Sequence, residues 1–218
     1  MGWHSSYTAG EPVGEFDITN GKMLVTDPCY ERGTWCHGIL ENVKNGTWEA
    51  HAYMEDYGRS LLGGTRVKAL AVKHKGTHLE GKFQEHSAPF EVGVDSGQAG
   101  FFNEALYPSG EPGEYGDLKS FYGRACAQTH DETNRHQHAG TITEGVVSSS
   151  GWGDGGYACT YVMDNEGFVV AARIDFITDD EDETDDEPQC SDCGSIEDLD
   201  GENHCEECAK QYTDEDSE

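Results

Sequence analysis

Two stretches of the chain carry the same residue pattern in the same order, and this internal repeat limits the fold more than any other feature. Residues 33–58 and 140–167 align with a two-residue insertion in the second stretch. The matched positions are Gly33-Thr34 with Gly140-Thr141, Gly38 with Gly145, Ile39-Leu40 with Val146-Val147, Trp48 with Tyr157, Met54 with Met163 and Gly58 with Gly167. Upstream, residues 21–27 resemble residues 97–103. Chance matching of glycines is the alternative, and the ordered series favours duplication of one unit.

Apolar residues recur at every second position within the repeated region, which is typical of β-strands. One such series is Tyr157, Cys159, Tyr161 and Met163, and the next is Phe168, Val170, Ala172, Ile174 and Phe176. Residues 164–167, Asp-Asn-Glu-Gly, lie between the two series and predict a hairpin turn. We therefore predict a mainly β (β-rich α+β) protein with antiparallel strands.

The repeat also predicts the domain limits. After an N-terminal segment, residues 1–14, we expect one duplicated domain over residues 15–177, with copies at about 15–74 and 89–177. Each copy is predicted to hold a strand pair, a longer strand and a closing hairpin. Two such sheets can bury their apolar faces against each other as a sandwich or a partly open barrel.

The second copy holds an extra stretch, residues 104–138. Apolar residues recur there at helical spacing, which predicts one short helix. These residues are Leu118, Phe121, Tyr122, Ala125 and Cys126.

Four cysteines near the C-terminus have the spacing of a metal site. Cys190, Cys193, Cys205 and Cys208 form two C-x-x-C pairs separated by eleven residues. Such pairs can place four thiolates around one Zn²⁺, and a site closed by four cysteines is structural. Chance pairing or a redox C-x-x-C is the alternative. We predict an acidic linker at residues 178–189, followed by a small zinc ribbon and acidic tail at 190–218.

Negative charge is concentrated in this same region. The formal net charge is −29, and residues 179–218 contribute −18 of it, from nineteen acids and one base. Such a tail argues against direct nucleic-acid binding and suits a partner protein with a basic surface. A mimic of nucleic acid and a solubilising linker are the alternatives. With no apolar run of membrane length and no leader sequence, we expect a soluble cytoplasmic protein that binds no membrane.

The loop at residues 148–157 is the most distinctive segment of the repeated region. It formally contains G-x-G-x-x-G, but a strand follows it, so we do not interpret it as a dinucleotide site. We expect its glycines to form a sharp turn that presents Ser149, Trp152, Asp154 and Tyr157 to a ligand. The alternative is a hairpin connection whose aspartate caps its own backbone. The matching loop of the first copy, residues 42–47, lacks the pattern, which favours a site.

A second candidate segment is Asp27-Pro28-Cys29-Tyr30, where a predicted strand ends. Asp27 and Cys29 are weak catalytic candidates, with His37 or His51 as the base that such a thiol requires. A packed, inert cysteine is the alternative. Tyr30 is a further ligand-binding candidate.

Two more polar groups are candidates. Asp95, in a predicted turn, can converge with Asp154 if the sheets pack as expected. His130, Asp131, His136 and His138 can ligate a metal, although so polar a segment is more typical of a solvated loop.

Several of these motifs resemble an uncharacterised bacterial and phage family, one of the domains of unknown function. The resemblance rests on Val94-Asp95-Ser96-Gly97-Gln98, on residues 148–157 and on the hairpin at 167–176, and Asp27-Pro28-Cys29-Tyr30 is similar to a further element. It covers most of residues 15–177, outside the acidic tail. It implies a compact β-rich fold and a bacterial or phage origin, with host cytoplasm as the location in the second case, and it implies no activity.

We carry three hypotheses for the function. The first is a non-enzymatic binding protein whose β domain binds a ligand or protein, while the zinc tail engages a second partner. The alternative is a metal-assisted hydrolase that uses Asp27, Asp95 and Asp154. The third is a virion or scaffold component.

Overall fold

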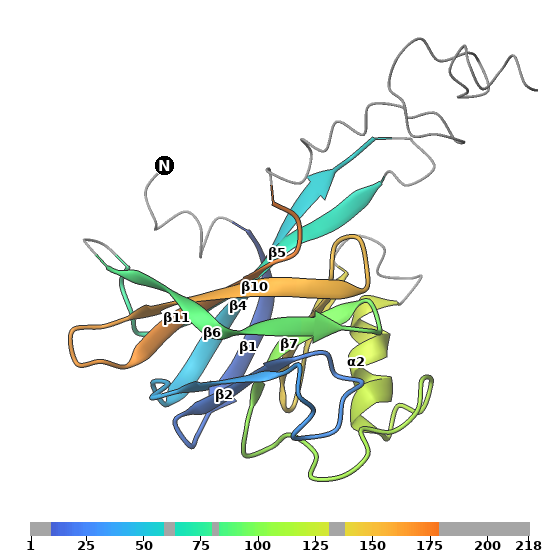
Figure 1. The fold of residues 1–218 in the computed structure, drawn as a ribbon, viewed down its shortest axis with the longest axis horizontal. Helices are drawn as coiled ribbons and strands as arrows, with labels where there is room; N and C mark the ends of the chain where they lie inside the picture. The colour runs from blue at the N-terminus through green and yellow to red at the C-terminus, as the bar shows by residue number, and fades with distance from the viewer. Residues whose placement is uncertain (1–9, 59–63, 80–82, 131–137, 179–218) are drawn as a thin grey trace, which may run out of the picture. The chain divides into compact units, whose positions relative to one another are not determined.

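The computed structural model describes residues 10–58, 64–79, 83–130 and 138–178. In these ranges the chain forms two antiparallel β-sheets and one short α-helix (Figure 1). The mainly β prediction is therefore confirmed, and the sheets do not close into a barrel. The predicted zinc ligands lie outside the described residues.

The larger sheet has six strands in the order β1-β4-β5-β11-β10-β6. Their bounds are β1 Glu11–Ile18, β4 Gly46–Asp56, β5 Thr65–His74, β11 Val169–Asp175, β10 Gly155–Met163 and β6 Glu85–Val94. The first strand begins inside the segment that we expected to precede the domain.

The smaller sheet has five strands in the order β3-β2-β7-β9-β8. Their bounds are β3 Gly38–Glu41, β2 Lys22–Thr26, β7 Gln98–Asn103, β9 Gly145–Ser149 and β8 Ala139–Ile142.

Strand order repeats along the chain as the aligned copies require. Strands β1, β4 and β5 occupy one half of the larger sheet, and β6, β10 and β11 occupy the other half in mirrored order. In the smaller sheet β3 and β2 correspond to β9 and β7, while β8 has no counterpart. Each sheet therefore contains strands from both halves of the chain, whereas we expected one sheet from each copy. Pairing across the copies gives each sheet enough strands to cover the other.

Strand register repeats as well. Phe16 pairs with Trp48 between β1 and β4, and Val92 pairs with Tyr157 between β6 and β10. A register shift falls immediately before Met54 where β4 meets β5. The same shift falls immediately before the aligned Met163 where β10 meets β11. A bulge at aligned positions is a specific feature of the backbone, so the two halves share geometry as well as strand order.

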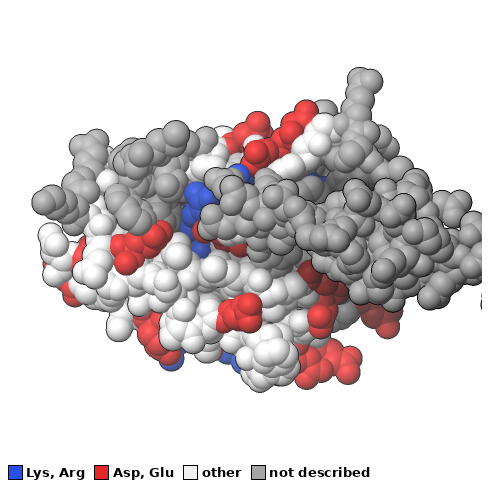
Figure 2. Space-filling model, turned by 45° about the horizontal axis from the view of Figure 1, so that its top comes forward, with Lys and Arg blue, Asp and Glu red and all other residues white. Residues whose placement is uncertain are grey.

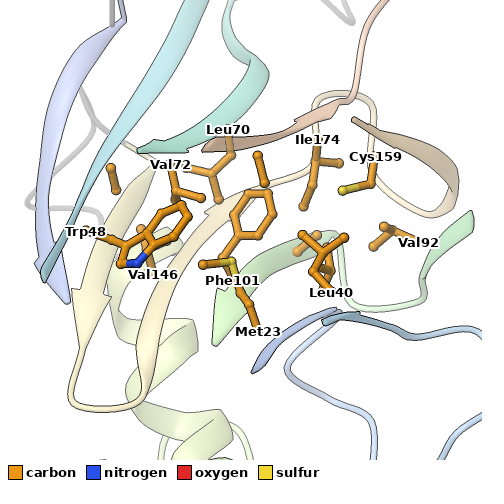
Figure 3. Packing of buried hydrophobic residues seen from close by; sticks show 14 of the residues in the cluster. Met23, Leu40, Trp48, Leu70, Val72, Val92, Phe101, Val146, Cys159 and Ile174 are labelled. Atoms are coloured by element: carbon orange, nitrogen blue, oxygen red, sulfur yellow. The ribbon is translucent and has the colours of Figure 1, made fainter. Parts of the chain in front are cut away.

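The core lies between the sheets and joins the two halves (Figure 3). Leu70, Val72 and Ile174 extend from the larger sheet toward Phe101 and the other labelled residues of the smaller sheet. All four of these side chains are fully buried. Because β2 and β7 pair at the centre of the smaller sheet, Phe101 contacts residues from both halves.

The predicted helix is confirmed as α2, Phe121–Thr129, with Ser120 as its N-cap. It packs on the outer face of the smaller sheet, where Phe121 and Ala125 meet Phe102 and Val147. Leu118 lies before the helix and is exposed. Among the described residues, no helix has the length and apolarity needed to cross a membrane.

Candidate binding site

The acid of the Asp-Pro-Cys-Tyr segment is a buried structural residue. Asp27 directly follows β2 and has no exposed surface. Its Oδ2 accepts the backbone N–H groups of Asp95 at 2.9 Å and Ser96 at 2.7 Å. Its Oδ1 accepts the N–H of Cys29 at 2.8 Å and the hydroxyl of Ser96 at 2.7 Å. Four hydrogen bonds compensate for burial of the carboxylate and fix the turn before β7. Asp27 therefore has no free oxygen for a substrate.

The corresponding residue in the second half, Asn103, also fixes neighbouring backbone, but two of its hydrogen bonds are donated by its side chain. Asn103 ends β7, and its Oδ1 accepts the N–H of Ala105 at 3.1 Å, as Asp27 accepts that of Cys29. Its Nδ2 donates to the carbonyl of Asp17 at 2.9 Å and to Thr19 Oγ1 at 3.1 Å, in the segment before β2. Both residues thus tie the end of one central strand to the entry of the other.

The thiol of Cys29 is not primed for nucleophilic attack. Burial raises the pKa of the Cys29 thiol far above its ordinary value, and the Asp27 carboxylate raises it further. The two histidines considered as bases have other partners. His37 Nε2 accepts the N–H of Gly33 at 3.0 Å, and His51 Nδ1 lies 3.2 Å from the carbonyl of Gly10.

Asp154 also has a structural contact, and the first half has an equivalent one. Its Oδ1 accepts the N–H of Gly97 at 3.1 Å. In the first half, Asn45 Oδ1 accepts the N–H of Gly21 at 2.8 Å. Gly21 and Gly97 adopt φ values of 71° and 67°, in the left-handed region that glycine enters without strain. The same side-chain contact therefore holds the same turn in both halves.

The ring after each loop secures it in the same way. Tyr157 Oη lies 2.7 Å from the Gly153 carbonyl and 3.0 Å from that of Ser150. Trp48 Nε1 donates to the carbonyl of Lys44, four residues earlier, at 3.0 Å. Tyr157 is thus a support of the loop.

The first of two hollows beside this loop is lined by acids and aromatic rings, and we call it the acidic hollow. Its volume is about 910 Å³. The side chains that matter for binding are Tyr30, Trp35, Phe90, Glu91, Asp95 and Asp154. They come from the β2–β3 connection, the end of β6 and the start of β10. Asp95 and Asp154 therefore do converge on one hollow.

The surroundings of the acidic hollow favour a cation. No Lys, Arg or His is among the described residues that line it. Burial raises the pKa of the Tyr30 hydroxyl well above its ordinary value, and the neighbouring Cys36 and Asp95 raise it further. Tyr30 therefore remains a neutral hydrogen-bond donor. Trp35 is 92% exposed and offers a free ring face. Acidic side chains are also spread over the described surface visible in Figure 2.

The second hollow is lined by residues 151–153 of the same loop and has different chemistry, and we call it the histidine hollow. Its volume is about 390 Å³. Its lining includes Arg66, Thr129, His130, His138, Ser149 and Trp152, and no described residue in it is acidic. The ring of Trp152 lies 4.9 Å from that of Tyr57, measured between centroids, and the Arg66 guanidinium lies 5.1 Å from its centroid.

The predicted ligand residues are therefore divided between two hollows. Tyr30 and Asp154 line the acidic hollow, Ser149 and Trp152 line the histidine hollow, and Tyr157 supports the loop between them. Sequence reasoning missed Trp35, Phe90, Glu91 and Arg66, which have no motif. The sequence signal that could have shown the two loops to be built alike was the Asx-Gly pair that they share, Asn45-Gly46 and Asp154-Gly155.

Of the predicted metal-binding segment, only His130 and His138 lie among the described residues. Both line the histidine hollow. Within the described part of the chain, no group of three or more His, Cys, Asp or Glu side chains is placed to hold one metal ion.

Comparison with known proteins agrees with the resemblance noted in the sequence. The pattern of a protein family of unknown function, DUF4241, matches residues 16–174, which include both halves of the β domain. No curated protein and no solved structure matches. The chain therefore belongs to the DUF4241 family.

Proposed function

We propose that this protein is a non-enzymatic binding protein whose β domain binds a basic segment of a partner protein in the acidic hollow. One observation carries the proposal: acids and aromatic rings line a single large hollow that has no basic residue among its described lining. Carboxylates attract a Lys or Arg side chain, and an exposed ring face adds a cation–π contact.

The geometry suits an arginine side chain in particular. Asp95 and Asp154 stand on adjacent turns and supply carboxylate oxygens, while Trp35 supplies a flat apolar face. A guanidinium group is planar, donates in several directions and stacks on aromatic rings. The Glu91 carboxylate lies over Gly156, so a side chain at position 156 would displace the flexible end of Glu91 from this place beside the hollow.

The test is titration of the full chain with a capped triarginine peptide, with a tricitrulline peptide of the same length as the uncharged control. We expect the double variant Asp95→Asn/Asp154→Asn to bind triarginine about tenfold more weakly, and Trp35→Ala several-fold more weakly. Calorimetry measures both affinities.

A matched control separates the hollow from general charge attraction. Glu111 is exposed, lies outside the hollow and loses one charge in Glu111→Gln. If Glu111→Gln weakens triarginine binding as much as Asp95→Asn does, the peptide responds to net charge and the acidic hollow is not the site.

We further propose that the C-terminal region is a structural zinc ribbon with an acidic tail for a second, basic partner. This proposal rests on the sequence alone, on the spacing of Cys190, Cys193, Cys205 and Cys208 and the charge of −18 over residues 179–218. Native mass spectrometry of the full chain should find one zinc, which Cys193→Ser should remove. A chain without metal would contradict the ribbon. The resemblance also supports a phage or bacterial source.

A further inference from the structure

The histidine hollow stands where the first half of the chain has a corner with paired charges. The loop around Val43 corresponds to the loop around Trp152, and the preceding residues, Asn42 and Gly151, both have positive φ, at 55° and 62°. Val43 is buried at 1% exposure, whereas Trp152 is 45% exposed. The second half thus turns a large aromatic ring toward the surface at a position where the first half buries a small side chain.

The hollow beside Val43 is lined by charged residues that already form ion pairs within the fold. It measures about 460 Å³ and is lined by Lys22, Glu41 and Lys44 among others. Lys22 pairs with Glu41 at 2.9 Å, and Lys44 pairs with Asp164 at 2.8 Å. The histidine hollow instead presents Trp152, which is 45% exposed beside Tyr57 and Arg66, and a histidine that caps the inserted helix.

Hydrogen bonds connect the buried carboxylate of Asp27 to this histidine. Ser96 Oγ donates to Asp27 Oδ1 at 2.7 Å, so its oxygen needs a donor. Gln98 Nε2 supplies that donor at 3.4 Å, which turns Gln98 Oε1 toward Thr129 Oγ1 at 2.7 Å. Thr129 Oγ1 lies 2.8 Å from His130 Nδ1. Gln98 has no exposed surface and Thr129 only 6%, so water does not compete along this path as far as Thr129, and the path ends at the exposed His130.

The direction of these bonds fixes the tautomer of His130. A threonine hydroxyl has one hydrogen, and the other partners of Thr129 are acceptors: Gln98 Oε1, and the carbonyl of Cys126 at 3.3 Å. Its hydrogen is therefore used, and the remaining contact requires His130 Nδ1 to donate. The neutral ring then carries its lone pair on Nε2, on the edge opposite the contact with Thr129.

We propose that the histidine hollow is a second binding site, for a small aromatic ligand that carries an O–H or N–H donor. The ligand ring packs against Trp152 and its donor bonds to His130 Nε2, which the hydrogen-bond chain from Asp27 holds as an acceptor. A hollow of about 390 Å³ has the size of a small-molecule site. This inference is independent of the acidic hollow, because the two hollows share no lining residue.

The tautomer is tested first, on the free full chain with ¹⁵N-labelled histidine. Long-range ¹H–¹⁵N spectra should show His130 protonated on Nδ1, opposite to the tautomer that free histidine favours. Thr129→Val, which keeps the shape and removes the hydroxyl, should return the ring to protonation on Nε2. Thr129→Ser should preserve the wild-type pattern. Protonation on Nε2 in the wild type would overturn the proposal.

The ligand class is tested with two probes that differ in one group, 4-methylphenol and its methyl ether. We expect 4-methylphenol to shift the His130 Nε2 and Trp152 indole signals and to bind about tenfold more tightly than the ether. In Trp152→Val, which copies the residue of the first half, both probes should lose binding. Equal affinity for the two probes, or binding that leaves the His130 signals unmoved, would overturn the proposed donor contact.

Discussion

The corner around Asn45 and the corner around Asp154 share a backbone and differ in what surrounds it. In both corners, an Asn or Asp side chain accepts the N–H of a glycine in the left-handed region. In both, an aromatic side chain also hydrogen-bonds to the backbone carbonyl four residues before it. Only the second corner has an exposed Trp152 and a neighbouring helix that supplies His130. The comparison separates the requirements of the fold, which are met twice, from features present once.

The largest loss of stability is expected from a substitution at the end of a central strand, β2 or β7. Asp27→Asn should lower the free energy of unfolding by about 3 kcal/mol, because the amide turns donors toward the N–H groups of Asp95 and Ser96. Urea unfolding of the full chain measures this. Asn serves at position 103 because the partners of its Nδ2 group there are acceptors. A midpoint equal to that of Asp95→Asn, an exposed control, would contradict the structural role of Asp27.

A smaller effect is expected where the rings secure the loops. Tyr157→Phe removes the hydroxyl contacts to Ser150 and Gly153 and should cost about 1.5 kcal/mol of unfolding free energy. Trp48→Phe removes the contact to the Lys44 carbonyl but also leaves space in the core, so it should cost more. Thermal unfolding ranks the two variants. A larger loss of stability for Tyr157→Phe than for Trp48→Phe would show that the two rings do not stabilise their loops in the same way.

Asp154→Asn separates the structural role of this position from its role in binding, because the first half already has an asparagine at the equivalent position 45. The amide oxygen can accept the Gly97 N–H, so stability should change by less than about 0.5 kcal/mol, whereas triarginine binding should weaken. Urea unfolding and calorimetry on the same preparation measure the two effects. Asp154→Ala, which removes the contact itself, should be clearly less stable than Asp154→Asn. Equal stability of the two variants would show that the Gly97 contact is unimportant.

The smallest effect concerns the edge-to-face ring pairs, Trp48 with His74 and Tyr157 with Phe176. Burial lowers the pKa of His74 below its ordinary value of 6.5, so the folded state favours the neutral ring. That contribution to stability is present above about pH 6.5 and is lost as the pH falls through the folded-state pKa.

His74→Phe copies the second half and should abolish this part of the pH dependence. The difference in unfolding free energy between wild type and variant, measured from about pH 8 to about pH 5, should shrink toward acid. A constant difference across this range would mean that His74 does not titrate with unfolding.

The sequence by itself determined the β architecture, the short helix and the aligned positions of the two halves. These follow from local rules: alternation marks strands, Asp-Asn-Glu-Gly marks a hairpin, and spacing marks the helix. The sequence also led us to expect that Asp95 and Asp154 converge, but through the packing of two sheets, whereas they meet because β6 and β10 pair within one sheet.

Only the tertiary structure decided which polar residues support the fold and which face a hollow. Asp27 seemed available in the sequence, but its oxygens are satisfied by a turn 68 and 69 residues away. Trp35 has no motif, and the sequence marked His130 only as a possible metal ligand, because the place of each residue in a hollow comes from neighbours on other strands. Burial and hydrogen-bond direction depend on contacts between distant segments, which local pattern does not encode.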